Sequence, residues 1–229
     1  MLAQEEKMMA TETNKNKGVF ITFEGGEGSG KSTQIQKLKN NILGFFSDVE
    51  IVISREPGGT EVAEQIRNIL VNGAADKLSV RAETLLMIAA RAEHVDRVIL
   101  PAINRGAIVL CDRFKDSSTV YQGIANNIPN REIDKIHAFA LKTCEPDLTI
   151  LLDVPAETGI KRAFDRNEKN QRFERKGEFF HKKIREGYLK IASSYPDRIK
   201  IIDGSQRIEK ISDEIFKLVS PILQSSLSK

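Results

Sequence analysis

The sequence lacks the features that mark secreted and membrane proteins. It has only two cysteines in 229 residues, Cys111 and Cys144, and they fall in different predicted elements, which excludes a disulfide framework and favours a reducing compartment, the cytoplasm. We expect both thiols to be buried as small apolar side chains. No apolar run reaches the length of a membrane span, and residues 1–17 are polar, without the apolar core of a signal peptide. We therefore expect a flexible leader at 1–17 and no membrane partner.

The sequence is also short of net charge and of metal-ligating clusters. With 35 Lys and Arg against 32 Asp and Glu, the formal net charge is +3, too small to indicate a nucleic-acid partner. The charge is uneven, because residues 161–185 hold ten Lys or Arg and four Asp or Glu. This segment is compatible both with a polyphosphate ligand and with a solvated helix face. The histidines, His94, His137 and His181, have no ligands at metal-site spacing, so we expect each on a helix surface or in the core.

The sequence does contain a regular alternation of strand and helix patterns. Short apolar, β-branched runs predict strands at 18–24, 49–54, 107–112, 147–154 and 198–203. Segments with apolar residues at helical spacing predict helices at 31–46, 60–70, 79–104, 133–144, 155–166, 177–195 and 208–223. Because the strands are apolar throughout, we expect an α/β fold with a parallel five-stranded sheet, helices on both faces, and one domain at 18–229.

A glycine-rich motif joins the first predicted strand to the first predicted helix. Gly25, Gly30, Lys31 and Ser32 in "GGEGSGKS" fit the pattern G-x-x-x-x-G-K-S/T. In such a loop the backbone N–H groups cradle phosphates, the lysine neutralises them, and the hydroxyl reaches Mg²⁺. Glu27 is unusual among these donors, and its carboxylate is either a surface group or a partner for a sugar hydroxyl or a Mg²⁺-bound water. The motif predicts a P-loop NTPase-type fold that binds ATP with Mg²⁺.

Charged and polar segments follow the other predicted strands. They are "REPGGT" at 55–60, "RFKDSSTVYQG" at 113–123 and "RNEKNQRFER" at 166–175. Ligands of open α/β sheets bind beyond the carboxyl ends of the strands. We therefore expect these segments to lie close to the glycine loop.

Taken together, the motifs resemble those of bacterial-type thymidylate kinases. The sequences "FEGGEGSGKST", "REPGGT", "LLMIAARAEHV", "DRFKDSSTVYQG" and "LLDVPAETGIKR" follow one another in the order and spacing of that family. The resemblance extends from about Gly18 to the C-terminus. It implies a nucleoside monophosphate kinase-like fold and a homodimer. It also implies transfer of the ATP γ-phosphate to thymidine 5′-monophosphate with Mg²⁺, a step in dTTP biosynthesis.

The resemblance also implies roles for individual residues. The ATP site would comprise Gly25, Gly26, Glu27, Gly28, Ser29, Gly30, Lys31, Ser32, Thr33 and Arg162. The monophosphate site would comprise Glu27, Glu56, Arg67, Met87, Arg91, Arg113, Ser117, Ser118, Tyr121 and Gln122. Ser32 and Asp112 would hold the metal ion. Within these sets Glu27 would face the sugar, Arg113 would clamp the acceptor phosphate, and Arg91 with Ser118 would hydrogen-bond the thymine ring.

The resemblance further implies that catalytic arginines come from a lid at about 162–175. The glycine loop itself has no arginine, which is typical of the branch of the family whose arginines lie in the lid. Arg162, Arg166 and Arg172 are the candidates there. The expected catalytic residues are Lys31, Glu27, Arg113, Arg166 and Arg172.

One position departs from the family pattern. Met87 stands where a phenylalanine usually stacks on thymine, so we expect looser recognition of the ring. The competing interpretations are a kinase for another nucleotide or nucleoside, a nucleotide-dependent switch or motor, and a regulator that binds ATP without catalysis. A GTPase is disfavoured because the sequence has no N-K-x-D motif. Leu85, Leu86, Ile88 and Val95 are expected on one apolar helix face, in the core or at a dimer interface.

Overall fold

The protein folds around one parallel sheet. The computed structural model describes residues 18–74, 76–165 and 177–227. Its strands are β1 (Val19–Glu24), β2 (Ile51–Arg55), β3 (Ile108–Asp112), β4 (Leu148–Asp153) and β5 (Ile199–Asp203), in the spatial order β2-β3-β1-β4-β5. All neighbouring pairs are parallel, with Val19 opposite Ile108 and Ile21 opposite Leu148. The expected fold, a P-loop type α/β domain with a five-stranded parallel sheet, is confirmed.

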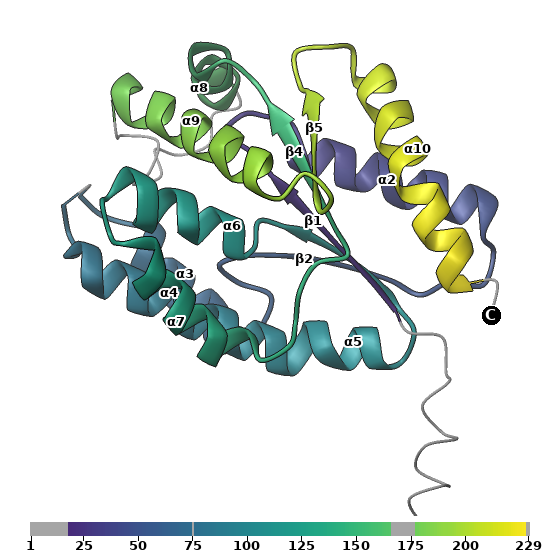
Figure 1. The fold of residues 1–229 in the computed structure, drawn as a ribbon, viewed down its shortest axis with the longest axis horizontal. Helices are drawn as coiled ribbons and strands as arrows, with labels where there is room; N and C mark the ends of the chain where they lie inside the picture. The colour runs from purple at the N-terminus through teal and green to yellow at the C-terminus, as the bar shows by residue number, and fades with distance from the viewer. Residues whose placement is uncertain (1–17, 75, 166–176, 228–229) are drawn as a thin grey trace, which may run out of the picture.

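Helices cover both faces of the sheet (Figure 1). They are α2 (Lys31–Phe45), α3 (Glu61–Val71), α4 (Val80–His94), η2 (Val95–Ile99), α5 (Leu100–Asn104), α6 (Lys115–Ser118), η3 (Thr119–Ala125), α7 (Asn130–Leu141), α8 (Ala156–Asp165), α9 (Glu178–Ser194) and α10 (Ile208–Leu227). Helices α2 and α10 lie together on one face, while α4, α5 and α7 lie on the other.

The period-two alternation of β1 divides the core between these two layers. Val19, Ile21 and Phe23 pack in a cluster with side chains of α2 and α10. Phe20, between them, packs in a second cluster with Val95 and its neighbours on η2 and α5. Successive side chains of a strand point to opposite faces, and all of these are buried, so the strand is apolar on both faces.

Local sequence signals set the starts of two helices next to the site. The side chain of Thr60 accepts a hydrogen bond from the backbone N–H of Ala63 at the start of α3, at 3.1 Å. The side chain of Ser79 does the same for Ala82 at the start of α4. Such caps satisfy N–H groups that have no partner within the helix. The two capped helices, α3 and α4, pack side by side.

The structure differs from the sequence-based expectations in three places. The helix expected at 79–104 is a succession of α4, η2 and α5, with wider π-type turns in the middle. The segment after β3, to which no helix was assigned, forms α6 and η3. Of the expected apolar face, Ile88 and Val95 are buried, whereas Leu85 is 58% exposed. The expected face is thus divided between the core and the exposed surface, whereas core and dimer interface were alternatives for it as a whole.

The strand ends converge at one edge of the sheet. The glycine loop follows β1, the cis peptide between Glu56 and Pro57 follows β2, and Arg113 follows β3. This brings the three segments expected from the motifs "GGEGSGKS", "REPGGT" and "RFKDSS" to one place. Among the described residues, no helix is both long and apolar enough to cross a membrane. The expected leader at 1–17 lies outside the described residues.

Candidate active site

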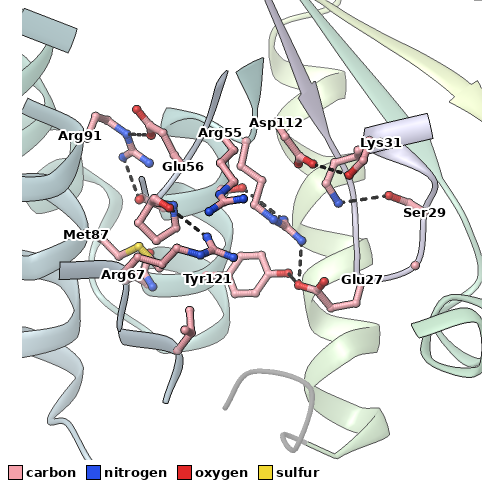
Figure 2. Close-up of a pocket in the computed structure, with 18 of the residues that line it drawn as sticks. Glu27, Ser29, Lys31, Arg55, Glu56, Arg67, Met87, Arg91, Asp112 and Tyr121 are labelled. Carbon is pink, nitrogen blue, oxygen red and sulfur yellow. Dashed lines mark hydrogen bonds and ion pairs between the residues drawn. The ribbon is translucent and has the colours of Figure 1, made fainter. Parts of the chain in front are cut away.

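A cavity of about 390 Å³ opens at the carboxyl ends of β1, β2 and β3 (Figure 2). All ten residues expected at the monophosphate site lie on its wall, together with Gly28, Ser29, Gly30, Lys31 and Ser32 of the glycine loop. Figure 2 shows Lys31 and Asp112 at one end of the cavity and Arg91 and Glu56 at the other. Gly25, Gly26 and Thr33 lie off the wall. The fold therefore brings the two predicted subsites into one continuous space.

The glycine loop forms the end that we call the phosphate end, residues 25–32. Gly25, Gly28 and Gly30 have φ angles of 141°, 67° and 93°, values that side chains rarely allow, so the loop needs glycine there. In the described part of the chain no side chain caps α2, which begins at Lys31. The N–H groups of its first turn have no partner within the helix and, with the helix dipole, favour an anion.

Lys31 lies folded over this loop. Its Nζ donates to the carbonyl of Gly26 at 3.1 Å and, more weakly, to the carbonyl of Gly25 and the hydroxyl of Ser29 at 3.4 Å. Burial, followed by the charge of Arg113, lowers the pKa of Lys31. A bound anion would offset both effects, so the arrangement is suited to a phosphate group.

The glycine loop also packs backbone to backbone on α8. A Cβ placed on Gly28 would lie 2.0 Å from the carbonyl oxygen of Gly159, and one placed on Gly159 would lie 2.3 Å from that of Glu27. Both distances are far shorter than a van der Waals contact. The loop and the helix can approach this closely only because neither residue has a side chain.

Ser32 and Asp112 face each other beside Lys31. The Ser32 hydroxyl donates to the Asp112 carboxylate at 3.1 Å. In the described ranges, no three His, Cys, Asp or Glu side chains gather as a metal site. One hydroxyl and one carboxylate are a small set of oxygen donors. They fit Mg²⁺, which commonly keeps waters and completes its shell with substrate phosphates.

Arg113 lies between the two ends of the cavity. Its Nη2 donates to Glu27 at 2.8 Å, and its Nη1 donates to the Gly25 carbonyl at 3.0 Å and to the Tyr188 hydroxyl at 3.1 Å. Its φ angle is 70°, a conformation that few residues other than glycine adopt, and such strain is concentrated at functional sites. Burial alone would raise the pKa of Glu27, but Arg113 and then Lys31 outweigh it and the pKa is lowered. Glu27 is therefore held as a carboxylate.

A buried carboxyl group supports this region from below. Glu24 accepts hydrogen bonds from the backbone N–H groups of Phe114 and Ser117 and from the hydroxyls of Ser117 and Tyr188. Burial, with a contribution from Asp116, raises the pKa of Glu24 to about 7. The four donors fix the start of the segment that follows Arg113. Glu24 and Tyr188 did not emerge from sequence reasoning, because their contact spans 164 residues.

The far end of the cavity, which we call the base end, is built around Arg91. This side chain is 2% exposed. Its Nε donates to Glu56 Oε2 at 2.6 Å, its Nη1 donates to Ser118 at 2.8 Å and to His137 Nε2 at 2.9 Å, and its Nη2 donates to the carbonyl of Phe114 at 2.9 Å. A buried charge is tolerated only when it is paired and hydrogen-bonded. The guanidinium group is thus locked in one orientation.

Buried histidines belong to this end of the cavity. His94 contacts the other oxygen of Glu56 through Nδ1 at 2.9 Å and the Ser54 hydroxyl through Nε2 at 2.6 Å. His94, His137 and His181 are all buried. Of the two positions expected for them, a helix surface or the core, each therefore takes the core. The involvement of His94 and His137 with the predicted site was missed, and no local signal in the sequence could have found it.

The remaining predicted residues are spread more widely. Gln122 donates to the buried Glu83 at 2.8 Å, and Arg67 donates to the Pro57 carbonyl at 2.9 Å. Arg162, expected at the ATP site, lies off the cavity wall and donates to the carbonyl of Gly204, in the turn after β5, at 3.0 Å. Arg166 and Arg172 lie outside the described residues. Arg55, Pro57 and Val71 also line the cavity but were not among the predicted contacts.

Comparisons with known proteins agree on one family. The family model described as "Thymidylate kinase" matches residues 23–215. A thymidylate kinase of Caulobacter vibrioides is 48% identical over 202 residues, which cover 88% of this chain and 96% of the relative. One of Afipia carboxidovorans is 43% identical and covers 95% and 96%. The crystal structure of a thymidylate kinase from Ehrlichia chaffeensis superposes with a TM-score of 0.72, at 31% identity, covering 89% of this chain and 99% of that one. Because the matched region contains the glycine loop and both ends of the cavity, we conclude that this chain belongs to the thymidylate kinase family.

Proposed function

We propose that this protein transfers the γ-phosphoryl group of ATP to thymidine 5′-monophosphate and so forms thymidine diphosphate, a step in dTTP synthesis. Membership of the thymidylate kinase family supports the reaction. The single structural observation that carries the proposal is the continuous cavity. It has a phosphate-binding loop at one end, a rigid hydrogen-bonding group at the other, and Arg113 between them. This spacing suits a donor phosphate and an acceptor nucleotide that meet at the arginine.

At the phosphate end, the proposed ATP contacts are the backbone of residues 25–33 and the ammonium group of Lys31. Ser32 and Asp112 would hold Mg²⁺. The chemistry that this ion supplies is neutralisation of charge on the transferring phosphate. Arg162 is proposed to contact ATP outside the main cavity, since its partner Gly204 is in the turn after β5.

On the acceptor side, Arg113 is proposed to bind the monophosphate. Its planar fork can bind two oxygens of one phosphate. Glu27, held beside it as a carboxylate, would accept a hydrogen bond from the sugar. Arg67, Ser117, Tyr121 and Gln122 would complete the wall, with Met87 against the face of the base. Arg91 and Ser118 would hydrogen-bond its edge.

The residues then need only to align two anions and offset their charge. The acceptor phosphate is already an anion at neutral pH, so no strong general base is needed. Lys31 and Arg113 would stabilise the charge that develops between the two phosphates. We propose that Arg166 and Arg172, in a lid at about 162–175, add to this charge and that lid closure excludes water.

The wider organisation is proposed on related grounds. We propose one catalytic domain at 18–229, a leader at 1–17, and no nucleic-acid partner. A homodimer is supported by large apolar side chains exposed on α3 and α4, which are Val62, Ile69, Val80 and Leu85. A cytoplasmic location is supported by the buried thiols of Cys111 and Cys144.

The test is coupled-assay turnover with ATP and Mg²⁺ against the monophosphates of thymidine, deoxyuridine, deoxycytidine, deoxyguanosine and adenosine. We expect kcat/KM for thymidine monophosphate to exceed every other value by at least about ten-fold, which is about 1.4 kcal/mol of discrimination. Comparable rates with deoxyuridine monophosphate would still support a nucleoside monophosphate kinase. They would attribute the weak discrimination between the two pyrimidine rings to Met87. Binding of ATP without turnover of any acceptor would overturn the proposed function.

A further inference from the structure

Among the residues that the structure describes, one N–H group of the Arg91 guanidinium has no partner. Arginine carries five N–H groups, and four of those of Arg91 already have partners, namely Glu56, Ser118, His137 and the carbonyl of Phe114. The remaining N–H is on Nη2. Arg91 lines the cavity although it is 2% exposed. Because Arg91 lines the cavity, this is the N–H that it could donate to a ring at the base end, and the orientation of the guanidinium plane decides where the N–H points.

His137 supplies one of the contacts that set this plane. It lies on α7, which packs on α4 opposite Arg91 (Figure 1). Arginine is always a donor, so Nε2 of His137 must be the acceptor and the ring must carry its proton on Nδ1. Burial, followed by the charge of Arg91, lowers the pKa of His137 to about 3. We therefore expect a neutral imidazole at neutral pH, with Nε2 as the acceptor.

The other partners of Arg91 do not replace this contact. Glu56 binds the Nε side of the group and the carbonyl of Phe114 binds Nη2, so His137 and Ser118 alone hold Nη1. Ser118 accepts from Arg91, which leaves its hydroxyl hydrogen for a ligand. The hydrogens that remain on Arg91 and Ser118 are both donors. They can therefore bond to a ring carbonyl such as O4 of thymine, which accepts, but not to the amino group of cytosine, which donates.

We propose that His137 is a positioning residue for base recognition, which orients Arg91 so that its spare N–H meets the ring carbonyl of the acceptor nucleotide. The inference rests on the proposed function and extends it to a residue that touches no substrate. Without an acceptor at position 137, a buried N–H of a cation loses its partner, and the guanidinium group is free to turn towards another one.

The surroundings of His137 make the idea testable by substitution. Its other side lines a second cavity of about 410 Å³, bounded by α7 and α9 and lined also by Asp134, Thr119 and Tyr195. A side chain of different shape can relax into that space. We therefore expect variants at position 137 to fold. Asp134 is exposed one turn earlier on the same helix, has no contact with Arg91, and serves as a matched control.

The experiment compares His137→Leu, which removes the acceptor, with His137→Gln, whose amide oxygen can take the place of Nε2. For His137→Leu we expect KM for thymidine monophosphate to rise about ten-fold, the loss expected for one orphaned charged donor. We expect kcat and KM for ATP to change less than about two-fold. The preference for thymidine over deoxycytidine monophosphate should fall in parallel. His137→Gln should restore most of both losses, and Asp134→Leu should match the parent.

An unchanged KM in His137→Leu, or a failure of His137→Gln to restore it at equal thermal stability, would overturn the inference while leaving the proposed function intact. A parent enzyme inactive on thymidine monophosphate would overturn both. If His137→Leu does not fold, nitrogen NMR of the parent labelled at histidine decides instead. An unprotonated Nε2 from pH 5 to 8 supports the assignment, and a protonated Nε2 excludes it.

Discussion

The two ends of the cavity are built in opposite ways. The phosphate end is eight consecutive residues, 25–32, whose useful groups belong mainly to the backbone. The base end consists of side chains from Glu56, Arg91, Ser118 and His137, which lie on or after four different elements. The first is encoded by a local motif, and the second exists only after the chain has folded.

The two ends also differ in how complete they are before a ligand binds. At the phosphate end, the partners of Lys31 within the described ranges are two carbonyls and a hydroxyl at 3.1–3.4 Å. At the base end nearly every donor of Arg91 is already satisfied. Stabilisation of a reacting phosphate needs groups that still have bonds to give, whereas discrimination between bases needs groups that cannot move. We infer from this contrast that the phosphate end governs the rate and the base end governs selectivity, and three substitutions test the inference.

The largest effect should come from Lys31→Ala. It removes the ammonium group that we propose stabilises the transferring phosphate, and we expect kcat to fall by about 1,000-fold, which is about 4 kcal/mol. The KM for the monophosphate should stay within a few-fold of the parent. Steady-state kinetics measure both values, and Lys37→Ala, on the outer face of the same helix beside Glu209, is the control. A loss confined to KM would contradict the division between rate and selectivity.

The second effect concerns the base end. Glu56→Gln keeps the shape of the side chain but leaves the buried Arg91 without its carboxylate. We expect a loss of about 3 kcal/mol in the free energy of unfolding, because one partner of a buried ion pair is removed. The KM for the monophosphate should rise while the KM for ATP stays constant. Denaturant unfolding and kinetics measure these quantities.

Glu50→Gln provides a matched control for that experiment. The Glu50 pair with Arg105 lies at the surface, so its loss should lower the free energy of unfolding far less than the loss of the buried pair. Equal losses in the two variants would show that burial of the Arg91 pair has no special role.

The smallest effect should come from Met87→Phe. Met87 is half-buried on the wall of the cavity, and an aromatic ring there would stack on the base more firmly than a thioether. We expect KM for thymidine monophosphate to fall by about two- to ten-fold, in line with about 0.5–1.5 kcal/mol for an aromatic pair. The kcat should be nearly unchanged. A higher KM would contradict stacking at this position.

Sequence reasoning recovered most of the fold because the deciding signals were local. Apolar strands and amphipathic helices are read from neighbouring residues, and the parallel sheet follows from their alternation. The segment after β3 was missed because its helices, α6 and η3, are short and buried at Ser117, Ser118 and Val120, so no apolar stripe stands out. The division of this apolar face of α4 between core and surface was missed because a helical period does not say which of its positions meet the core.

For the candidate site, residues could be predicted from the sequence only where they lie close to one another along the chain. The glycine loop and the residues near it could be predicted because one motif contains them. Glu24, Tyr188 and His137 could not, because a buried polar side chain is defined by partners that only the fold supplies. The contact between His137 and Arg91 spans 46 residues. No pattern of residue types in the sequence predicts this contact.

The contact between Gly28 and Gly159 sets a limit on how this enzyme can vary. Gly159 lies in α8, outside the glycine motif, where a helix would ordinarily gain stability from alanine. Here the methyl group of alanine would meet the backbone of Glu27. Gly159 therefore cannot be replaced even by alanine, the residue that helices tolerate best. We expect a deep mutational scan to find Gly159 as intolerant of substitution as the glycines of the loop. A residue far from the motif is under the same steric constraint as the motif itself, because the two backbones leave no room for a side chain between them.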